Sequence, residues 1–204
     1  VVFIATFVAG ELGYDKDLKN TENIYIGHEE EFAIMSYTVG DVSVQEFPEE
    51  EEVCRFISTS ILRGLAYEVT VGGETIPQNA IIADDNFFDF FTFPLLEGDT
   101  ENALSSKYSV VISEEMANTL FPDGDALGKE INVFERNPFW QWSDEPVEDL
   151  NVNLTVTGIF KPFSRTVFIE PDIIMNIDLI FEKQQSLFQG GMRIAEYSFV
   201  KLDK

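Results

Sequence analysis

The chain has 204 residues, 45% of them hydrophobic and 25% charged, which is enough for one good core or for two small lobes that share a boundary. Its 37 acidic and 13 basic residues give a formal net charge of -24, which repels phosphate backbones and anionic lipid headgroups and excludes nucleic acid as a partner. The acidity is typical of a solvated surface that keeps a domain soluble. Attraction of a cationic or Ca²⁺-bearing partner is the alternative interpretation.

The first nine residues are uniformly apolar but fall short of the roughly 20 residues that cross a bilayer. Taken alone, they fit a buried strand or a trimmed signal-peptide core. Further along, residues 24–26 predict a strand with residues 32–37 as its partner, and residues 42–47 predict a short helix. Pro48 must end that helix, because the residue before a proline is pushed out of helical space.

The next part of the chain predicts a meander of strands. The acidic residues 49–52 are expected to form an exposed connection, and alternating apolar residues then predict strands at 53–57, 65–71 and 75–83. Gly72-Gly73 suits a two-residue hairpin turn. Cys54 is the one cysteine, so it cannot form an internal disulfide, and we expect a half-buried, inert thiol.

Aromatic residues dominate the segment that follows. Phe87, Phe90 and Phe91 fall at i, i+3 and i+4, which predicts a short helical turn with one apolar face, and Pro94 and Gly98 are expected to stop it. Nothing in this pattern carries chemistry, so the aromatics are expected to be scaffold.

A strand, a cap and a helix are predicted next. Residues 108–112 are β-branched and apolar, Ser113 can cap a helix, and Glu114 and Glu115 then lie in the first turn, where the helix dipole favours anions. Three residues of the helix are expected to face inward: Met116, Ala117 and Leu120.

Turn residues divide the rest of the chain into strands and one helix. Pro122-Asp123-Gly124 is expected to end the preceding helix, and Gly128 to permit a tight bend before the next strand. The remaining pattern predicts strands at 130–133, 154–160, 166–175 with a kink at Pro171, and 196–202, and a helix at 178–186.

The order FFDFFTFPLLEGD, SVVISEEMANTLF and DALGKEI resembles the extracytoplasmic domain of MacB/FtsX-type ABC transporter permeases, in the form common in Bacteroidetes. Residues 11–25 are similar to the family segment that follows the first membrane helix, and residues 154–160 to a later core strand. The resemblance covers roughly residues 10–204. Four motifs in the family's order are far more specific than any one of them.

This resemblance implies an α+β fold with two lobes. Residues 10–84 and 163–204 would form a porter-like βαβ lobe, and residues 85–162 an inserted mixed α/β lobe. Residues 1–9 would then be the outer end of a first membrane helix or a stem. Family domains continue into a helix that leads to the second membrane span, whereas this sequence stops at Lys204; the membrane-spanning part is expected outside it.

The same resemblance implies a non-enzymatic domain without a cofactor, which faces the periplasm at the inner membrane and relays ATP-driven conformational change. The implied partners are a cognate ABC ATPase reached through the membrane part, a second permease copy, and cargo, a periplasmic adaptor or an outer-membrane protein. Two other classes stay open: a free-standing binding module of carbohydrate or adhesin type, and a secreted hydrolase that uses acidic residues.

Catalytic and metal-binding patterns are scarce in this sequence. His28 is the one histidine and stands among glutamates, so neither a catalytic triad nor a zinc site is indicated. Asp84-Asp85 and Asp123-Gly124-Asp125 lack the alternating oxygen ligands of an EF-hand and are better explained as a cap and a turn. No phosphate-binding loop is present.

One segment offers a functional interpretation. Between residues 132 and 151 the chain carries Phe139, Trp140 and Trp142 among carboxylates, with neither helical nor strand periodicity. These aromatics are expected either to fill the space between lobes or to form an exposed partner-binding tip, because tryptophans in polar loops are favoured at interfaces. In a free-standing module they would be a sugar platform.

Overall fold

The computed structural model describes residues 23–26, 50–58, 67–71, 73–135, 149–161, 171–183 and 197–202. The strands in these ranges are β1 (Ile24–Ile26), β2 (Glu50–Ser58), β3 (Tyr67–Val71), β4 (Glu74–Gln78), β5 (Ala80–Ala83), β6 (Leu95–Gly98), β7 (Ser109–Ser113), β8 (Glu130–Glu135), β9 (Leu150–Phe160), β10 (Ile173–Asn176) and β11 (Tyr197–Leu202). The helices are α3 (Phe87–Phe90), α4 (Glu114–Leu120) and α5 (Ile177–Lys183). The predicted α+β class is confirmed.

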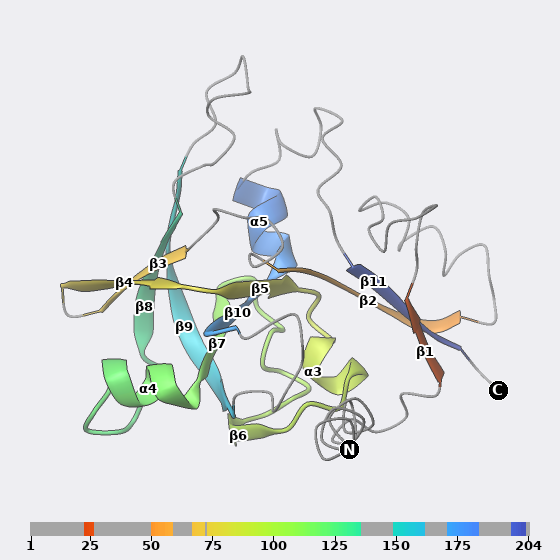
Figure 1. Cartoon of the computed structure of the whole chain (residues 1–204), viewed down its shortest axis with the longest axis horizontal. Coiled ribbons are helices and arrows are strands. Elements are labelled where there is room, and N and C mark those ends of the chain that lie inside the picture. Colours follow the sequence, from red (N-terminus) through yellow and green to blue (C-terminus); the bar gives the residue numbers. More distant parts are fainter. Residues whose placement is uncertain are drawn as a thin grey trace, which may run out of the picture.

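All eleven strands belong to one mixed sheet (Figure 1). Their order is β1-β11-β2-β5-β10-β7-β9-β8-β3-β4, with β6 pairing with β9 outside this path. Two pairs are parallel, β5 with β10 and β7 with β9, and the others are antiparallel. β10, which comes late in the chain, therefore lies in the middle of the sheet between strands formed much earlier.

The sheet runs without interruption across the boundary expected between the two lobes. The five strands from β1 to β10 in the sheet order come from residues 10–84 and 163–204, and the next three, β7, β9 and β8, come from residues 85–162. The hairpin β3–β4 belongs to the first part of the chain but ends the sheet beside β8. The two parts are thus joined through β10–β7 and through β3–β8, and their division into lobes stays a prediction.

Several predicted elements are confirmed, and the hairpin is one of them. Val71 lies opposite Glu74, so the turn holds two residues, and Gly73 has a φ of +90° that suits glycine. β1 forms where expected and pairs with β11, whereas the expected partner at residues 32–37 lies outside the described residues, as does the expected helix at 42–47.

The predicted meander of strands at residues 53–83 was wrong. β2 pairs with β11 and β5 and not with β3, so residues 53–83 do not form a meander. Instead Asn79 splits the expected third strand: its carbonyl accepts hydrogen bonds from the backbone of Asp172 and Ile173, and its own N–H donates to the Asp172 carboxylate. This break lets the chain leave the sheet edge at β4 and enter the centre as β5.

The acidic residues 49–52 were predicted to be an exposed connection, and this was wrong as well, because β2 begins at Glu50. Glu52 lies opposite Lys201 on β11, and their side chains form an ion pair at 3.6 Å. The lysine offsets the mutual repulsion of the glutamates, which is why an acidic run can start a strand here.

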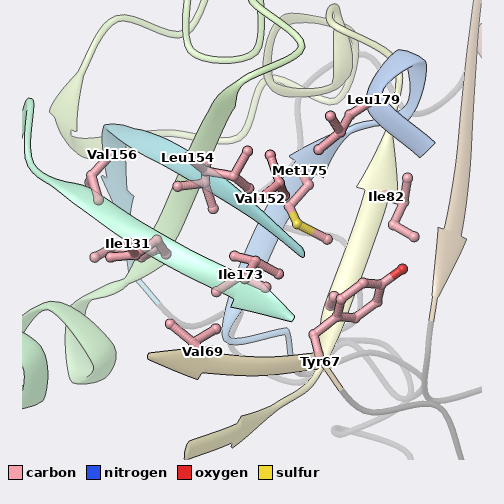
Figure 2. Close-up of a cluster of buried hydrophobic side chains, with 14 of the residues drawn as sticks. Tyr67, Val69, Ile82, Ile131, Val152, Leu154, Val156, Ile173, Met175 and Leu179 are labelled. Atoms are coloured by element: carbon pink, nitrogen blue, oxygen red, sulfur yellow. The ribbon is translucent and has the colours of Figure 1, made fainter. Parts of the chain in front are cut away.

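One side of the sheet packs an aliphatic core, which Figure 2 shows in close-up. β3, β8 and the first half of β9 bring Tyr67, Val69, Ile131, Val152 and Leu154 toward residues of the central strands. The helices α4 and α5 add buried residues to the same cluster. We call the buried residues of this cluster the aliphatic core, since branched aliphatic side chains predominate in it.

The other side packs an aromatic core. Its largest members are Phe56, Phe87, Phe88, Phe90, Phe91 and Phe160. Val111 and Ile174 face this side, whereas their neighbours in β7 and β10 face the aliphatic core, as the two-residue period of a strand requires. Figure 1 shows α3 and α5 on opposite sides of the central strands.

Candidate functional site

The helix α3 is the centre of the aromatic core and confirms the predicted short aromatic helix. Phe87 and Phe91 have ring centroids 5.3 Å apart in an edge-to-face arrangement, and Phe90 and Phe91 have centroids 4.9 Å apart. Phe88, which the helical spacing did not single out, is fully buried as well. The helix of four residues therefore buries nearly its whole circumference and exposes Asp89.

Rings from distant strands hold this helix against the sheet. Phe56 of β2 stacks on Phe199 of β11 at 5.5 Å, and the same Phe56 meets Phe87 edge-to-face at 5.7 Å. Phe199 also contacts Phe91, at 5.2 Å. Such ring pairs contribute about 0.5–1.5 kcal/mol each beyond the area that they bury.

A strained C-terminus fixes the direction in which the chain leaves α3. The N–H of Thr92 donates to the carbonyl of Asp89 and the N–H of Phe93 to the carbonyl of Phe88, which is the Schellman pattern, and the residue in the left-handed position is Thr92 with a φ of +54°. Glycine is usual at this position, and a β-branched residue there costs about 1–3 kcal/mol. Proline at position 94 then prevents the helix from continuing.

A polar clamp joins β2 to the start of α3. Arg55 donates from Nε and Nη2 to the two carboxylate oxygens of Asp84 at 3.0 Å each. The Arg55 N–H donates to Asp84 Oδ2 as well, and the Asp84 N–H donates to the Arg55 carbonyl. Asn86 donates to the Glu52 carboxylate and to the Val53 carbonyl, both at 2.9 Å. The two-pronged guanidinium contact sets the orientation as well as the distance.

Cys54 lies beside this clamp and is fully buried, not half-buried as expected. Burial, together with the neighbouring carboxylates of Asp84 and Glu52, raises the pKa of the thiol well above its usual value. A thiol that resists deprotonation is a poor nucleophile, in agreement with the predicted inertness.

The second region of interest is the seam where β10 pairs with β7. Asn176 lies at the end of β10 and is buried: its Nδ2 donates to the carbonyl of Leu104 at 2.7 Å, and its Oδ1 accepts from the N–H of Asp178 at 2.7 Å. One amide thus caps α5 and holds the connection between β6 and β7. On the surface, Lys107 of that connection also pairs with Glu182 of α5.

The strand and helix that follow the seam confirm the sequence prediction closely. The Ser113 hydroxyl accepts a hydrogen bond from the N–H of Met116 at 3.2 Å, so Ser113 is the N-cap of α4. Glu114 and Glu115 lie exposed in the first turn, and Met116 and Ala117 are buried in the aliphatic core, with Leu120 partly buried against it.

A buried hydroxyl and carboxylate lie at the far end of the aliphatic core. Tyr67 is fully buried and hydrogen-bonded to Glu135, which is itself only 4% exposed. Burial, followed by the charge of Glu135 and this hydrogen bond, raises the pKa of Tyr67 well above its usual value. Glu135 is the last residue of β8, so this pair anchors the strand from which the segment 136–148 departs.

The candidate partner-binding residues Phe139, Trp140 and Trp142 lie outside the described residues, and so does His28. Asp84 is held by Arg55, and the turn predicted at Asp123-Gly124-Asp125 is confirmed by positive φ at Gly124 and Asp125. Among the described residues, no three His, Cys, Asp or Glu side chains gather in a way that could hold a metal ion.

Comparison with known proteins identifies the family. The model of the MacB-like periplasmic core domain matches residues 1–204, and the chain therefore belongs to the MacB-like periplasmic core domain family. An uncharacterized ABC transporter permease of Bacillus subtilis (strain 168), YvrN, is 47% identical over 94 residues, which are 41% of this chain and 23% of that protein. The chain is thus a periplasmic domain of the ABC transporter permease type.

Solved structures agree on the fold. A domain of a putative permease protein from Porphyromonas gingivalis matches with a TM-score of 0.65 at 22% identity, over 93% of this chain and 76% of that one. The periplasmic region of MacB from Actinobacillus actinomycetemcomitans matches with a TM-score of 0.55 at 15% identity, over 91% and 79%. The extracellular domain of the noncanonic ABC-type transporter YknZ from Gram-positive bacteria gives 0.53 at 12% identity, over 89% and 82%.

Among the helices of the described ranges, none combines the length and the apolar run that a bilayer crossing needs.

Sequence reasoning missed three features of these regions. Asn176 could have been found, because it is the one polar residue in the run from Ile173 to Ile177 and lies two positions before the predicted helix at 178–186. The pairing of Arg55 with Asp84 had no local signal, since 29 residues separate them. The contact of Tyr67 with Glu135 likewise depends on the register of β3 against β8, which was not predicted.

Proposed function

We propose that this domain is the non-catalytic external relay of an ABC transporter permease in the inner membrane, with its body in the periplasm. ATP binding and hydrolysis by a cognate ATPase would move the membrane helices, and this domain would carry that movement to a second permease copy and to cargo or a periplasmic partner. Relaying a displacement requires a body that moves as a unit, because packed cores transmit strain and loops absorb it.

The observation that carries the proposal is the uninterrupted sheet, clamped on both sides of the β10–β7 seam. Backbone pairing joins Ile173, Ile174 and Met175 to β7, the buried amide of Asn176 ties α5 to the connection before β7, and α3 is locked to β2 by Arg55 and Asp84. A displacement applied at one end of such a sheet would reach the other end without being lost in a hinge.

The test is a distance measurement in the assembled transporter. The whole permease with its ATPase is placed in lipid nanodiscs, with a spin label on a cysteine introduced at the exposed Asp123. Pulsed electron paramagnetic resonance then measures the distance between the labels on the two permease copies. Cys54 is fully buried and does not compete for the label. We expect the distance distribution to shift between the nucleotide-free state and the state trapped after hydrolysis, and not to shift when the ATPase cannot bind ATP.

An unchanged distribution in a transporter that hydrolyses ATP at its normal rate would refute the relay. Hydrolysis of a glycan or peptide by the purified protein, lost on substitution of an acidic residue, would refute the non-catalytic part of the proposal.

Phe139, Trp140 and Trp142 are proposed as the contact with cargo or an adaptor. Replacing Trp140 and Trp142 with alanine should lower transport while leaving the melting temperature within a few degrees of the parent. If the melting temperature instead falls steeply, these tryptophans fill a core and the proposed contact is wrong.

A further inference from the structure

The outer face of β3, β4, β8 and β9 differs in charge from the rest of the described surface. These strands turn Tyr67, Val69, Ile131 and Val152 inward to the aliphatic core, so the alternating residues point outward. We call the uncharged polar ones the polar face: Thr70, Thr75, Asn132, Asn151, Asn153 and Thr155. One apolar residue, Phe134, points to the same side between Glu68 and Asn151.

The polar face is a continuous row across four strands. Thr75 lies opposite Thr70, Thr70 opposite Asn132, and Asn132 opposite Asn153. The two threonine hydroxyls are 2.8 Å apart, and the Asn132 amide donates to the side-chain oxygens of Asn151 and Asn153 at 2.9 Å each. The side chains hold one another in place, so this surface is organised before any partner arrives.

The row keeps unused hydrogen-bonding capacity. The amide nitrogens of Asn151 and Asn153 have no partner within the described ranges, and both residues are exposed. Each side chain offers donors beside an acceptor. A surface that carries both kinds of group can pair with a copy of itself across a two-fold axis, which an all-acceptor carboxylate surface cannot do.

Elsewhere the described surface carries carboxylates. The exposed ones near α3, β6, α4 and α5 are Asp85, Asp89, Glu97, Asp99, Glu101, Glu114, Glu115, Asp123, Asp125, Asp178 and Glu182. On the strands of the polar face, Glu68 and Glu130 point to the same side, and Glu74 is exposed beside the β3–β4 turn. With a formal net charge of -24 per chain, two copies repel each other unless the surfaces that meet are uncharged.

The free edge of the sheet is protected from pairing with another strand, which leaves the face as the contact. Pro77 lies opposite Glu68 on β4, and because Val71 and Glu74 flank the two-residue turn, Pro77 falls at a position whose nitrogen points away from β3. A proline there offers no N–H to an incoming strand.

We propose that the polar face is the surface through which two copies of this domain contact each other in the assembled transporter. The proposal rests on the proposed function, which requires a second copy. Its hydrogen bonds exchange readily with water, so the contact can form and separate as the two domains shift, unlike the apolar interface of a permanent dimer.

The test uses the whole permease with its ATPase in membranes. One variant carries Asn153→Cys and a second carries Asp123→Cys, the exposed turn after α4, and each is treated with a short bismaleimide. We expect Asn153→Cys to give a covalent permease dimer at least fivefold more efficiently than Asp123→Cys. Equal yields, a higher yield at Asp123→Cys, or a product at the mass of another protein would overturn the proposal.

A charge variant tests whether the two copies meet at this face because it is uncharged. Asn153→Asp keeps the oxygen that accepts from Asn132 but adds a carboxylate to the face, and Asn118→Asp adds the same charge on the exposed side of α4. The reporter is Thr75→Cys, an exposed position in the same row that leaves the Asn132 amide in place. Combined with it, Asn153→Asp should lower the dimer yield severalfold at low salt, with recovery at high salt, and Asn118→Asp should not. Equal yields for the two charge variants would overturn the proposal.

The two proposals fail separately. If Asn153→Cys does not form a dimer but the label at residue 123 still reports an ATP-dependent shift, the relay stands and this surface is wrong. If the dimer forms through Asn153 but no shift follows ATP, the surface stands and the relay is wrong.

Discussion

The aromatic core and the aliphatic core lie on opposite sides of the same central strands but are built differently. On the aromatic side a helix of four residues covers the sheet, and the six buried phenylalanines are the largest members of the core, three of them in the helix itself. On the aliphatic side many branched residues from β3, β8, β9 and the central strands pack with α4 and α5, and the one fully buried aromatic is Tyr67. The chain thus uses few large side chains where the covering element is short.

This difference implies different sensitivities to substitution. A four-residue helix has no stability of its own in water and is held by its tertiary contacts. Stability on the aromatic side is therefore concentrated in single rings, whereas on the aliphatic side it is spread over many methyl groups.

The largest effect is expected from Phe90→Ala. Phe90 is 2% exposed, and loss of a buried phenylalanine ring costs about 3–5 kcal/mol of unfolding free energy. Urea denaturation of the domain would measure it. Asp89→Ala, on the exposed side of the same helix, should change the unfolding free energy by less than about 0.5 kcal/mol; similar losses in the two variants would mean that ring burial is not what holds α3.

A smaller loss is expected from Gly98→Ala, at the end of the strand that joins the aromatic side to β9. Gly98 has a φ of +105°, and an added Cβ would lie 2.5 Å from the carbonyl oxygen of Thr157. The backbone strain alone costs about 1–3 kcal/mol, and the overlap adds to it.

Gly124→Ala is the matched control for this clash. Gly124 also has a positive φ, +81°, but nothing lies within 4 Å of the added Cβ. Its melting temperature should fall less than that of Gly98→Ala. The reverse order would show that the close approach of β6 to β9 does not add to the destabilisation.

On the aliphatic side, Tyr67→Phe should cost about 1–3 kcal/mol, because it removes a hydrogen-bond donor from the buried carboxylate of Glu135. The variant keeps the ring, so packing is nearly unchanged. Chemical denaturation at pH 7 measures the loss, and a variant as stable as the parent would contradict the role of this hydrogen bond.

The same substitution has a pH signature. The pKa of Tyr67 in the folded state is raised above the ordinary value of 10.0, so the folded protein holds this proton more tightly than the unfolded chain does. Its contribution to stability is complete below about pH 10 and declines as the pH rises above that value. The unfolding free energy of Tyr67→Phe should therefore fall less steeply between pH 10 and 11.5 than that of the parent.

The smallest effect is expected from Ser113→Ala. The substitution removes the hydroxyl that accepts from the N–H of Met116, which costs about 1 kcal/mol for a helix N-cap. Ser113→Asp restores an acceptor and should recover most of the loss in a thermal melt. If it does not, the cap adds nothing to the packing of α4.

The sequence predicted local features well because each depends on neighbouring residues. The cap at Ser113, the hairpin turn at Gly72-Gly73 and the buried face of α3 follow from spacing and residue type within a few positions. The partners of the strands did not follow. β2 pairs with β5 and β11, and its pairing with β3 was expected only because the two are consecutive in the chain.

The candidate site shows the same division. Family motifs pointed to the class of protein, but the contacts that fix the site join residues far apart in sequence. Asn176 bonds to Leu104 at the β10–β7 seam, and Arg55 pairs with Asp84 between β2 and the start of α3. The polar face appears as single polar residues alternating within four strands, and its continuity exists only after the register of those strands is known.

The position of β10 and β11 within the sheet constrains when this domain can fold. β10 fills the gap between β5 and β7, and β11 fills the gap between β1 and β2. The last two strands of the described residues therefore complete pairings that earlier strands leave open. Until they arrive, β5 and β7 expose unpaired edges, which is the condition under which chains associate wrongly. A nascent domain of this architecture therefore stays open to wrong pairing until β10 and β11 have been synthesised, longer than a meander of equal length does.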